Sequence, residues 1–223
     1  MTSMAKKMVA QMPLALGIFA VVVFVPAWTL RYWQAWVFLG VYLAPLIAML
    51  LYLMKKDPKL FERRVRRRWE TRPTQKIIQF AMLITFIAMM VSSVLDHRFG
   101  WSHVPAYAVI GGDAVVVLGY AMLFFVFREN TYTSAVIEID ADQKVISTGP
   151  YAVVRHPMYS AALVMVAGFA PALGSWWGLL GMIPMTAVIV WRLLDEEKFL
   201  AASLPGYTEY LRTVKYRLVP HVW

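Results

Sequence analysis

The sequence predicts an all-α integral membrane protein with about six transmembrane helices, a small loop or hairpin and a helical C-terminal tail at one membrane face. Of its 223 residues, 60% are hydrophobic and only 16% are charged, whereas soluble domains are about 45–50% apolar and about 25% charged. The apolar residues occur in blocks long enough to cross a bilayer, which takes about 20 residues. Lysine and arginine gather on one side of these blocks, so the sequence also predicts an orientation.

Six apolar blocks are the predicted spans. They cover residues 13–30, 34–54, 77–95, 104–127, 157–173 and 176–194. The first block follows two lysines, as a signal peptide would, but it continues without a small-residue cleavage site and is predicted to be an uncleaved span. Gly174 and Ser175 alone separate the last two blocks, which must therefore form an antiparallel pair.

The loops on one side of the spans hold all of the 22 lysines and arginines except Arg31 and Arg98. Such residues favour the cytoplasmic side, so both termini and the active site are predicted to be cytoplasmic, at the plasma or inner membrane if the source is bacterial. The net charge of +9 is attributed to this topology and to attraction for anionic lipid. No soluble basic face is visible, so a nucleic-acid partner is not expected.

The chain is predicted to be a single structural domain with two functional parts. Residues 1–127 form the N-terminal transmembrane helices with a basic inner loop at 55–76, and residues 128–223 form the cofactor-binding catalytic region. Alternation at residues 136–139 and the short apolar run at 144–146 suggest a small β-hairpin within the second part.

The basic loop at 55–76 contains apolar residues at helical spacing, which predicts a basic amphipathic helix at the lipid headgroups. Two roles stay open for this helix. It either anchors the protein at the interface, or one of its arginines binds an anionic substrate headgroup. The apolar residues are Leu60, Phe61, Val65 and Trp69, and the arginines in question are Arg63, Arg64 and Arg67.

Two features limit the chemistry that the chain can perform. It contains no cysteine, which excludes disulfides, thiolate nucleophiles and cysteine-ligated metals. Its four histidines are not spaced as a metal site, so no metal is expected. Asp113 lies inside a predicted span, which by default suggests a function, but it is far from the cytoplasmic motifs. A structural role is favoured for it, either as a helix cap or as a side chain that reaches water.

Two motifs occur at the cytoplasmic ends of the last two spans: GPYAVVRHPMY at residues 149–159 and RLLDEE at residues 192–197. The proline of the first suits the first turn of a helix, whose N–H groups attract a carboxylate. Because the two spans are antiparallel, both motifs lie at the same depth. Farther on, Tyr207 and Tyr210 face one way and either cover the site or lie at the interface.

S-adenosylmethionine is the ligand that suits these groups. Carboxylates can bind its amine or ribose, the helix start can bind its carboxylate, and tyrosine faces favour its sulfonium cation. No Gly-x-Gly-x-x-Gly follows a strand, so a soluble Rossmann-type methyltransferase is excluded.

The two motifs and the Gly206-Tyr207-x-x-Tyr210…Pro220 tail resemble the isoprenylcysteine carboxyl methyltransferase family and the wider group of membrane phospholipid methyltransferases. The resemblance covers about residues 128–222. It implies an S-adenosylmethionine-dependent methyltransferase that releases S-adenosylhomocysteine. It carries cofactor contact to Tyr151, Arg155, His156, Pro157, Tyr159, Glu196 and Glu197, and Gly149 and Tyr207 join them as candidates. The candidate acceptor contacts are Arg192, Asn130 and Tyr210, and the candidate catalytic residues are Arg192, Glu196 and His156.

The predicted reaction is methyl transfer to a carboxylate or thiol of a lipophilic, isoprenylcysteine-like acceptor, because a carboxylate or a thiolate needs no general base. The expected partners are this small or lipidated acceptor and the membrane lipids, with no obligate protein partner. A phospholipid N-methyltransferase is one alternative, and an NADPH-dependent membrane reductase of the sterol type is another. A non-catalytic scaffold that binds anionic lipid is the third.

Overall fold

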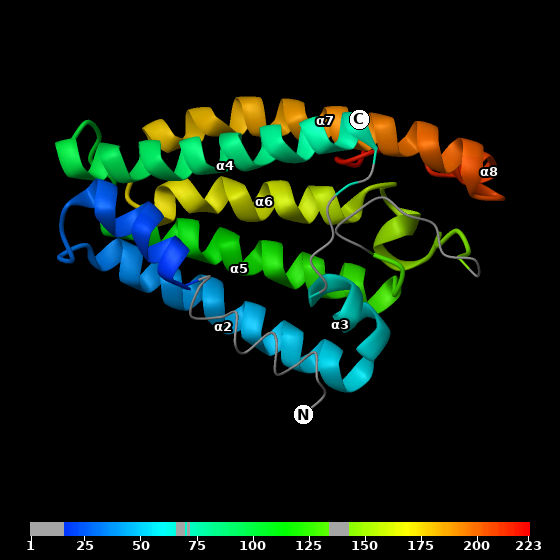
Figure 1. The fold of residues 1–223 in the computed structure, drawn as a ribbon, viewed down its shortest axis with the longest axis horizontal. Coiled ribbons are helices and arrows are strands. Elements are labelled where there is room, and N and C mark those ends of the chain that lie inside the picture. The colour runs from blue at the N-terminus through cyan, green and yellow to red at the C-terminus, as the bar shows by residue number, and fades with distance from the viewer. Residues whose placement is uncertain (1–15, 66–69, 71, 134–142) are drawn as a thin grey trace.

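A computed structural model of the chain describes residues 16–65, 70, 72–133 and 143–223. In this part of the chain the fold is all-helical, and the long helices run side by side along one axis (Figure 1). The predicted fold class is therefore confirmed. The long helices are Leu16–Ala27, α2 (Trp33–Lys56), α4 (Pro73–Phe99), α5 (Ala106–Glu129), α6 (Pro157–Ala172) and α7 (Met182–Ser203). The short helices are α3 (Pro58–Val65), η1 (Gly149–Ala152), η2 (Trp177–Gly181) and α8 (Tyr207–Thr213).

Each of the six predicted spans coincides with one of the long helices. Among the described residues, four helical stretches are long and apolar enough to cross a membrane, namely α2, α4, α5 and the run of η2 and α7, while Leu16–Ala27 and α6 are shorter apolar helices. The last span continues to Ser203 instead of ending near residue 194. Glu196 and Glu197 therefore lie within a continuous helix and do not follow it. The predicted strand at 136–139 lies outside the described residues, and residues 144–146 are loop.

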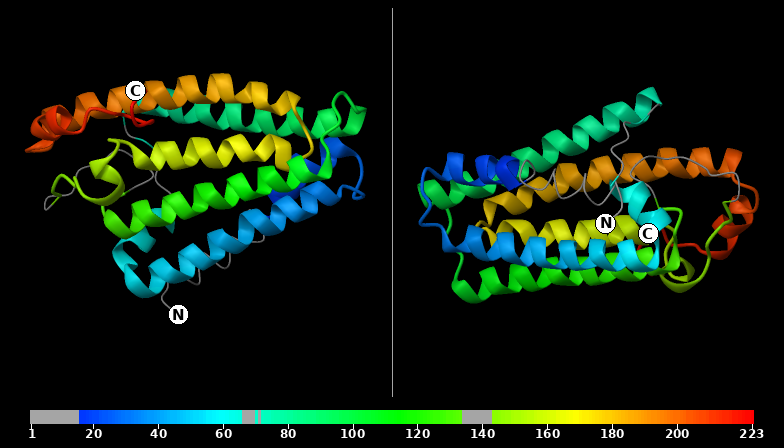
Figure 2. Two further views of the ribbon diagram at one scale, coloured as in Figure 1. Left: turned by 180° about the vertical axis from the view of Figure 1, so that it is seen from behind. Right: turned by 60° about the horizontal axis from the view of Figure 1, so that its bottom comes forward.

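The two ends of the bundle differ in chemistry. The segments that carry α3, η1 and α8 lie together at one end, which we call the basic end, and the connections around residues 28–32, 100–105 and 173–177 lie at the opposite end (Figure 2). Tryptophans are exposed at that opposite end, with exposed fractions of 78% for Trp28, 55% for Trp101 and 53% for Trp177. This distribution fits the aromatic belt expected where a membrane protein meets the headgroups.

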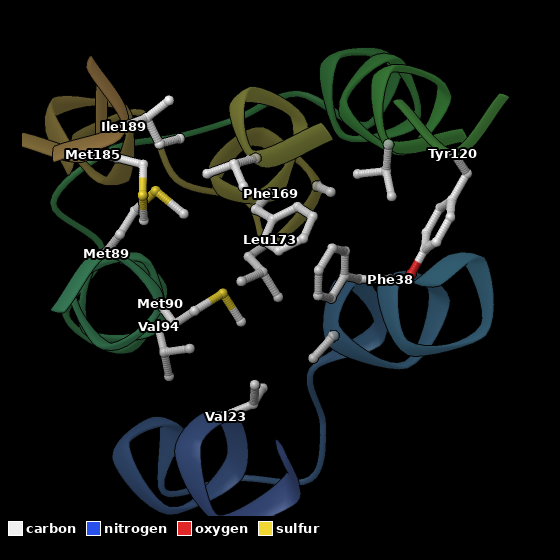
Figure 3. Packing of buried hydrophobic residues seen from close by; sticks show 14 of the residues in the cluster. Val23, Phe38, Met89, Met90, Val94, Tyr120, Phe169, Leu173, Met185 and Ile189 are labelled. Carbon is white, nitrogen blue, oxygen red and sulfur yellow. The ribbon is translucent and has the colours of Figure 1, made fainter. Parts of the chain in front are cut away.

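All six long helices contribute to one apolar core. Phe169 of α6 lies at its centre, between Phe38 of α2 on one side and Met89 of α4 on the other (Figure 3). Ile189 of α7 and Val23 of the first helix close the cluster from opposite sides. The core therefore fixes α6 relative to α7, and these are the two helices that carry the predicted motifs.

The packing of α5 against α6 is close because glycines face each other. A Cβ added to Gly112 would lie 2.5 Å from the backbone nitrogen of Ala172 and 2.9 Å from the carbonyl oxygen of Gly168. A Cβ added to Gly168 would in turn lie 2.5 Å from the carbonyl oxygen of Gly112. Small residues of this kind let membrane helices approach backbone to backbone.

We expect Gly112→Ala to lower the free energy of unfolding by about 1–3 kcal/mol, because the added methyl group forces the two backbones apart. The neighbouring Gly111→Ala is the matched control, since a Cβ at Gly111 meets nothing within 4 Å. Alanine has the better helix propensity, so the control should be neutral or slightly stabilising. Equilibrium unfolding in mixed micelles measures both variants, and equal effects at the two glycines would contradict this account.

Helix α3 folds against the bundle at the basic end. Leu60 and Phe61 are almost fully buried, and they pack with Phe127 of α5 and Ala161 of α6. A helix is thus present in the first part of the basic loop, and its Leu60 and Phe61 turn towards the protein, while Arg67 and Trp69 lie outside the described residues. This placement brings the arginines of α3 close to the start of α6.

Candidate active site

A cavity of about 110 Å³ opens at the basic end of the bundle, which is smaller than the usual range of about 300–1,000 Å³ for small-molecule sites. Its lining comes from the end of α5, the 143–146 loop, η1, the start of α6, the end of α7 and α8. Every predicted site residue except Gly149 and Glu197 lines it. These lining residues are Asn130, Tyr151, Arg155, His156, Pro157, Tyr159, Arg192, Glu196, Tyr207 and Tyr210.

The start of α6 is held by the C-terminal segment, residues 214–223. Pro157 occupies the first turn of α6 and His156 the N-cap position, as the sequence predicted from the fixed φ of proline. The backbone N–H of Arg155 donates to the carbonyl of Tyr216 at 2.9 Å, and that of His156 donates to the carbonyl of Arg217 at 3.0 Å. The backbone before the helix is therefore fixed, and with it the positions of these two side chains.

The three consecutive acidic residues of α7 point to three different partners. Asp195 faces α4, where its carboxylate accepts from Arg72 at 2.7 Å and from the Gln75 amide. Glu196 faces the cavity, and Glu197 faces the start of α6 and the C-terminal segment. Helical geometry causes this divergence, because successive residues point about 100° apart around the axis. Of the three, only Glu196 presents its carboxylate to the cavity.

Glu197 is a buried junction between three segments. Its Oε1 lies 3.0 Å from the guanidinium of Arg155 and 3.2 Å from Nε2 of His156, and its Oε2 accepts from Nε of Arg217 at 3.0 Å. A carboxylate can only accept, so His156 must donate through Nε2. Glu197 therefore positions residues that line the cavity and lies behind them.

A chain of polar contacts crosses the cavity floor. The hydroxyl of Tyr159 donates to Oε2 of Glu196 at 2.6 Å and accepts from Nε of Arg192 at 2.9 Å. The other end of Arg192 lies 3.2 Å from Oε1 of Glu70, which is only 2% exposed. The structure thus links Arg192 to Glu196 through a tyrosine, although the two residues are also four positions apart on one face of α7.

Glu70 was not predicted as a site residue, because it is far from both motifs along the chain. It is the one acidic residue in the run RRRWETR at residues 66–72. A single carboxylate among so many cations could have indicated an ion pair with an arginine elsewhere in the chain, because a buried arginine such as Arg192 needs an acidic partner. Arg192 is 122 positions away, so spacing could not have joined the two.

Tyrosines close the cavity on the side of α8. The hydroxyl of Tyr210 donates to the carbonyl of Tyr151 at 2.8 Å, and the ring of Tyr207 lies 5.7 Å from that of Tyr210. Both α8 rings are buried, which favours the covering role over the interfacial one. Burial raises the pKa of the Tyr151 hydroxyl to about 12, while a hydrogen bond with Asn130 acts the other way. Tyr151 therefore stays neutral at physiological pH.

Gly149 lies outside the cavity lining and has a backbone role. Its φ of +56° is in the left-handed region, which glycine tolerates best. A Cβ there would lie 2.9 Å from the carboxylate of Glu129. The structure therefore uses Gly149 to turn the chain into η1.

Over part of its length, the chain is similar to a family of membrane methyltransferases. Residues 107–205 match the family model described as phospholipid methyltransferase, a family within the isoprenylcysteine carboxyl methyltransferase type of membrane methyltransferases. The match covers nearly all of α5, all of α6 and α7, and therefore the start of α6 and the glutamates of α7. It confirms the resemblance predicted from the motifs. No curated protein matches the chain.

Proposed function

We propose that the protein transfers the methyl group of S-adenosylmethionine to a carboxylate or thiol of a lipophilic, isoprenylcysteine-like acceptor at the cytoplasmic face of the membrane. The observation that carries the proposal is the convergence of Glu196, Tyr159 and Arg192 on one cavity. The region that supplies these residues matches a methyltransferase family. The basic end of the bundle faces the cytoplasm in this proposal, in accord with the charge bias of the loops.

The residues of the cavity fit the proposed methyl donor. Glu196 offers a carboxylate for its amine or ribose hydroxyls. The N-terminus of α6 and the adjacent Arg155 suit its carboxylate, and the tyrosine rings provide faces for a cation. When bound, the donor supplies a methyl group on a sulfonium that is already a good leaving group. The task left to the protein is to align the two reactants, an effect that reaches about 7–11 kcal/mol in favourable systems.

A lipophilic acceptor is supported by a second, apolar space within the spans. A groove of about 380 Å³ lies between the first helix, α2 and α4, and its lining is almost entirely aliphatic and aromatic. Leu50 of α2 lines this groove and also packs in the cluster that contains Met158, a cavity residue. An acceptor with an apolar tail in the groove would have its head near the basic end.

The description of the matching family favours one alternative, which is N-methylation of a phospholipid amine. The product distinguishes the two reactions. A labelled methyl ester releases labelled methanol in mild base, whereas an N-methyl group or a thioether does not. Assays with purified protein and labelled donor should therefore offer an S-prenylated cysteine and phosphatidylethanolamine side by side.

We expect Glu196→Gln to weaken binding of S-adenosylhomocysteine, the product form of the donor, at least tenfold. Hydrogen bonds to charged groups contribute about 1.5–3 kcal/mol, and about 1.4 kcal/mol corresponds to tenfold in affinity. Isothermal titration of detergent-purified protein measures the change. Glu209→Gln is the matched control, because Glu209 is exposed on α8 and pairs with Arg212. Binding should stay at the wild-type value in that variant.

Titration of the wild-type protein with NADPH completes the test. Binding of NADPH without binding of S-adenosylhomocysteine would favour the membrane reductase and overturn the proposal. Binding of neither S-adenosylhomocysteine nor NADPH would favour the non-catalytic scaffold.

A further inference from the structure

Arg64 lies on the face of α3 that is turned towards the bundle. It follows the buried Leu60 and Phe61 by four and three residues, which places it on the same helix face. Its neighbour Arg63 points elsewhere, and its guanidinium donates to the carbonyl of Thr131 at 3.2 Å. The two arginines are therefore adjacent in sequence but differ in environment.

The surroundings of the Arg64 guanidinium are largely apolar. One terminal nitrogen lies 2.8 Å from Sδ of Met158, and Cζ lies 4.3 Å above the ring of Phe127. Its Nε is buried and has no hydrogen-bond partner. Within the described ranges, no carboxylate lies at ion-pair distance from it.

Two other described arginines, Arg72 and Arg155, also have a buried Nε without a hydrogen-bond partner. Unlike Arg64, each forms an ion pair, Arg72 with Asp195 at 2.7 Å and Arg155 with Glu197 at 3.0 Å. Arg64 as a whole is half-buried, and removing a cation from water without a counter-ion costs free energy. Burial lowers the pKa of Arg64 to about 10, and repulsion by Arg192 adds to the effect, while Tyr151 and Tyr159 oppose it. A group with this pKa is still charged at neutral pH, so the positive charge of Arg64 remains without a counter-ion.

The position of Arg64 connects it to the cavity. Arg64 contacts Met158, which lines the cavity. Tyr151, Tyr159 and Arg192 also line the cavity, and their charges affect the pKa of Arg64. Methionine is unbranched and adapts its shape easily, so the Met158 side chain can move aside for a ligand atom. Arg64 thus lies directly behind the cavity lining, on the side where α3 meets the spans.

We propose that Arg64 binds an anionic oxygen group of the methyl acceptor, either a carboxylate or a phosphodiester on an apolar tail, and so selects anionic over neutral acceptors. The inference rests on the proposed function, whose acceptor it specifies further. A guanidinium suits this role because its planar fork matches both anions. The acceptor then supplies the counter-ion that the described part of the chain does not provide to Arg64.

The test compares three probes with equal tails: decanoate, the diester decyl methyl phosphate, and decanol. Each is titrated into wild-type protein, Arg64→Met, Arg64→Lys and Arg63→Met in micelles of a neutral detergent. We expect the wild type to bind at least one of the two anions at least tenfold more tightly than decanol. Arg64→Met should abolish this preference, Arg64→Lys should keep part of it, and Arg63→Met should keep it in full. The two anionic arms show whether the group is a carboxylate or a phosphate.

Several outcomes overturn the inference. They are equal affinity of the wild type for all three probes, equal loss in the Arg63 and Arg64 variants, or an unchanged preference in Arg64→Met. S-adenosylhomocysteine affinity separates this test from that of the proposed function. It should stay within about twofold in Arg64→Met, which also shows that the variant is folded. If the wild type binds no S-adenosylhomocysteine, the proposed function fails whatever the probes show.

Discussion

Replacing Arg192 by methionine should reduce methyl transfer about 100- to 1,000-fold, the usual effect of removing one positioned donor from a reacting centre. Arg192 lines the cavity and is only 7% exposed, and its Nε holds the hydroxyl of Tyr159 at 2.9 Å. We infer that the guanidinium orients the acceptor beside Glu196. Transfer of a radiolabelled methyl group to the lipid acceptor measures the loss of activity. The variant should lower kcat more than it changes KM for the methyl donor.

The single variant also affects stability, because Glu70 would lose its ion pair with Arg192. Breaking a buried ion pair by removing one member costs about 3–5 kcal/mol, and Glu70 is 2% exposed. The double variant Arg192→Met/Glu70→Gln removes both charges and should recover most of the stability. Its activity should nevertheless remain as low as that of the single variant. Recovery of activity together with stability would show that Arg192 has only a structural role.

The positions of the long helices were predictable because apolar periodicity and length decide which segments enter a bilayer. The error at the end of the last span has a physical origin. Polar residues at 195–198 mark where the chain leaves the apolar layer, but helical hydrogen bonds do not end there, and α7 continues to Ser203. Hydropathy reports the environment of a segment, whereas helix length also depends on signals such as Pro205 and Gly206.

The candidate site was predictable in composition but not in its internal contacts. The antiparallel hairpin brings the start of α6 to the end of α7, as the short connection required. Which glutamate faces the cavity depends on the rotation of α7 about its axis. That rotation is set by the partners of Asp195 and Glu197, namely Arg72 at the N-cap of α4 and Arg217 in the C-terminal segment. Both arginines lie far from the acidic residues in sequence, and no local sequence pattern predicts these ion pairs.

The carboxylates within the spans show the same limit. Asp113 was expected to cap a helix or to reach water, but it lies inside α5, is 6% exposed, and neither carboxylate oxygen has a hydrogen-bond partner. Asp96 was not predicted to have any role, yet it is fully buried and accepts hydrogen bonds from two other segments, at Ser102 and Ser175. Burial and satisfaction of a carboxylate depend on tertiary neighbours, which hydropathy does not reveal.

Asp96→Ala should lower the free energy of unfolding by about 3–5 kcal/mol, because several buried donors lose their acceptor at a cost of about 1–3 kcal/mol each. The carboxylate accepts from the backbone N–H of Ser102 at 2.7 Å and from the hydroxyls of Ser102 and Ser175 at 2.6 Å each. These contacts join the end of α4 to the connection after it and to the turn between α6 and η2. Thermal unfolding in detergent should show a midpoint about 10 °C lower.

A graded series tests whether this hydrogen-bond network causes the loss. Ser175→Ala removes one donor and should cost less than Asp96→Ala. Ser92→Ala is the control, because its hydroxyl only donates to the carbonyl of Met89 in the same helix, and it should be nearly neutral. The affinity of folded Asp96→Ala for S-adenosylhomocysteine should match the wild type, since the network lies at the end of the bundle opposite the cavity. An Asp96→Ala midpoint equal to that of Ser92→Ala would contradict the assignment of the carboxylate as the junction of these segments.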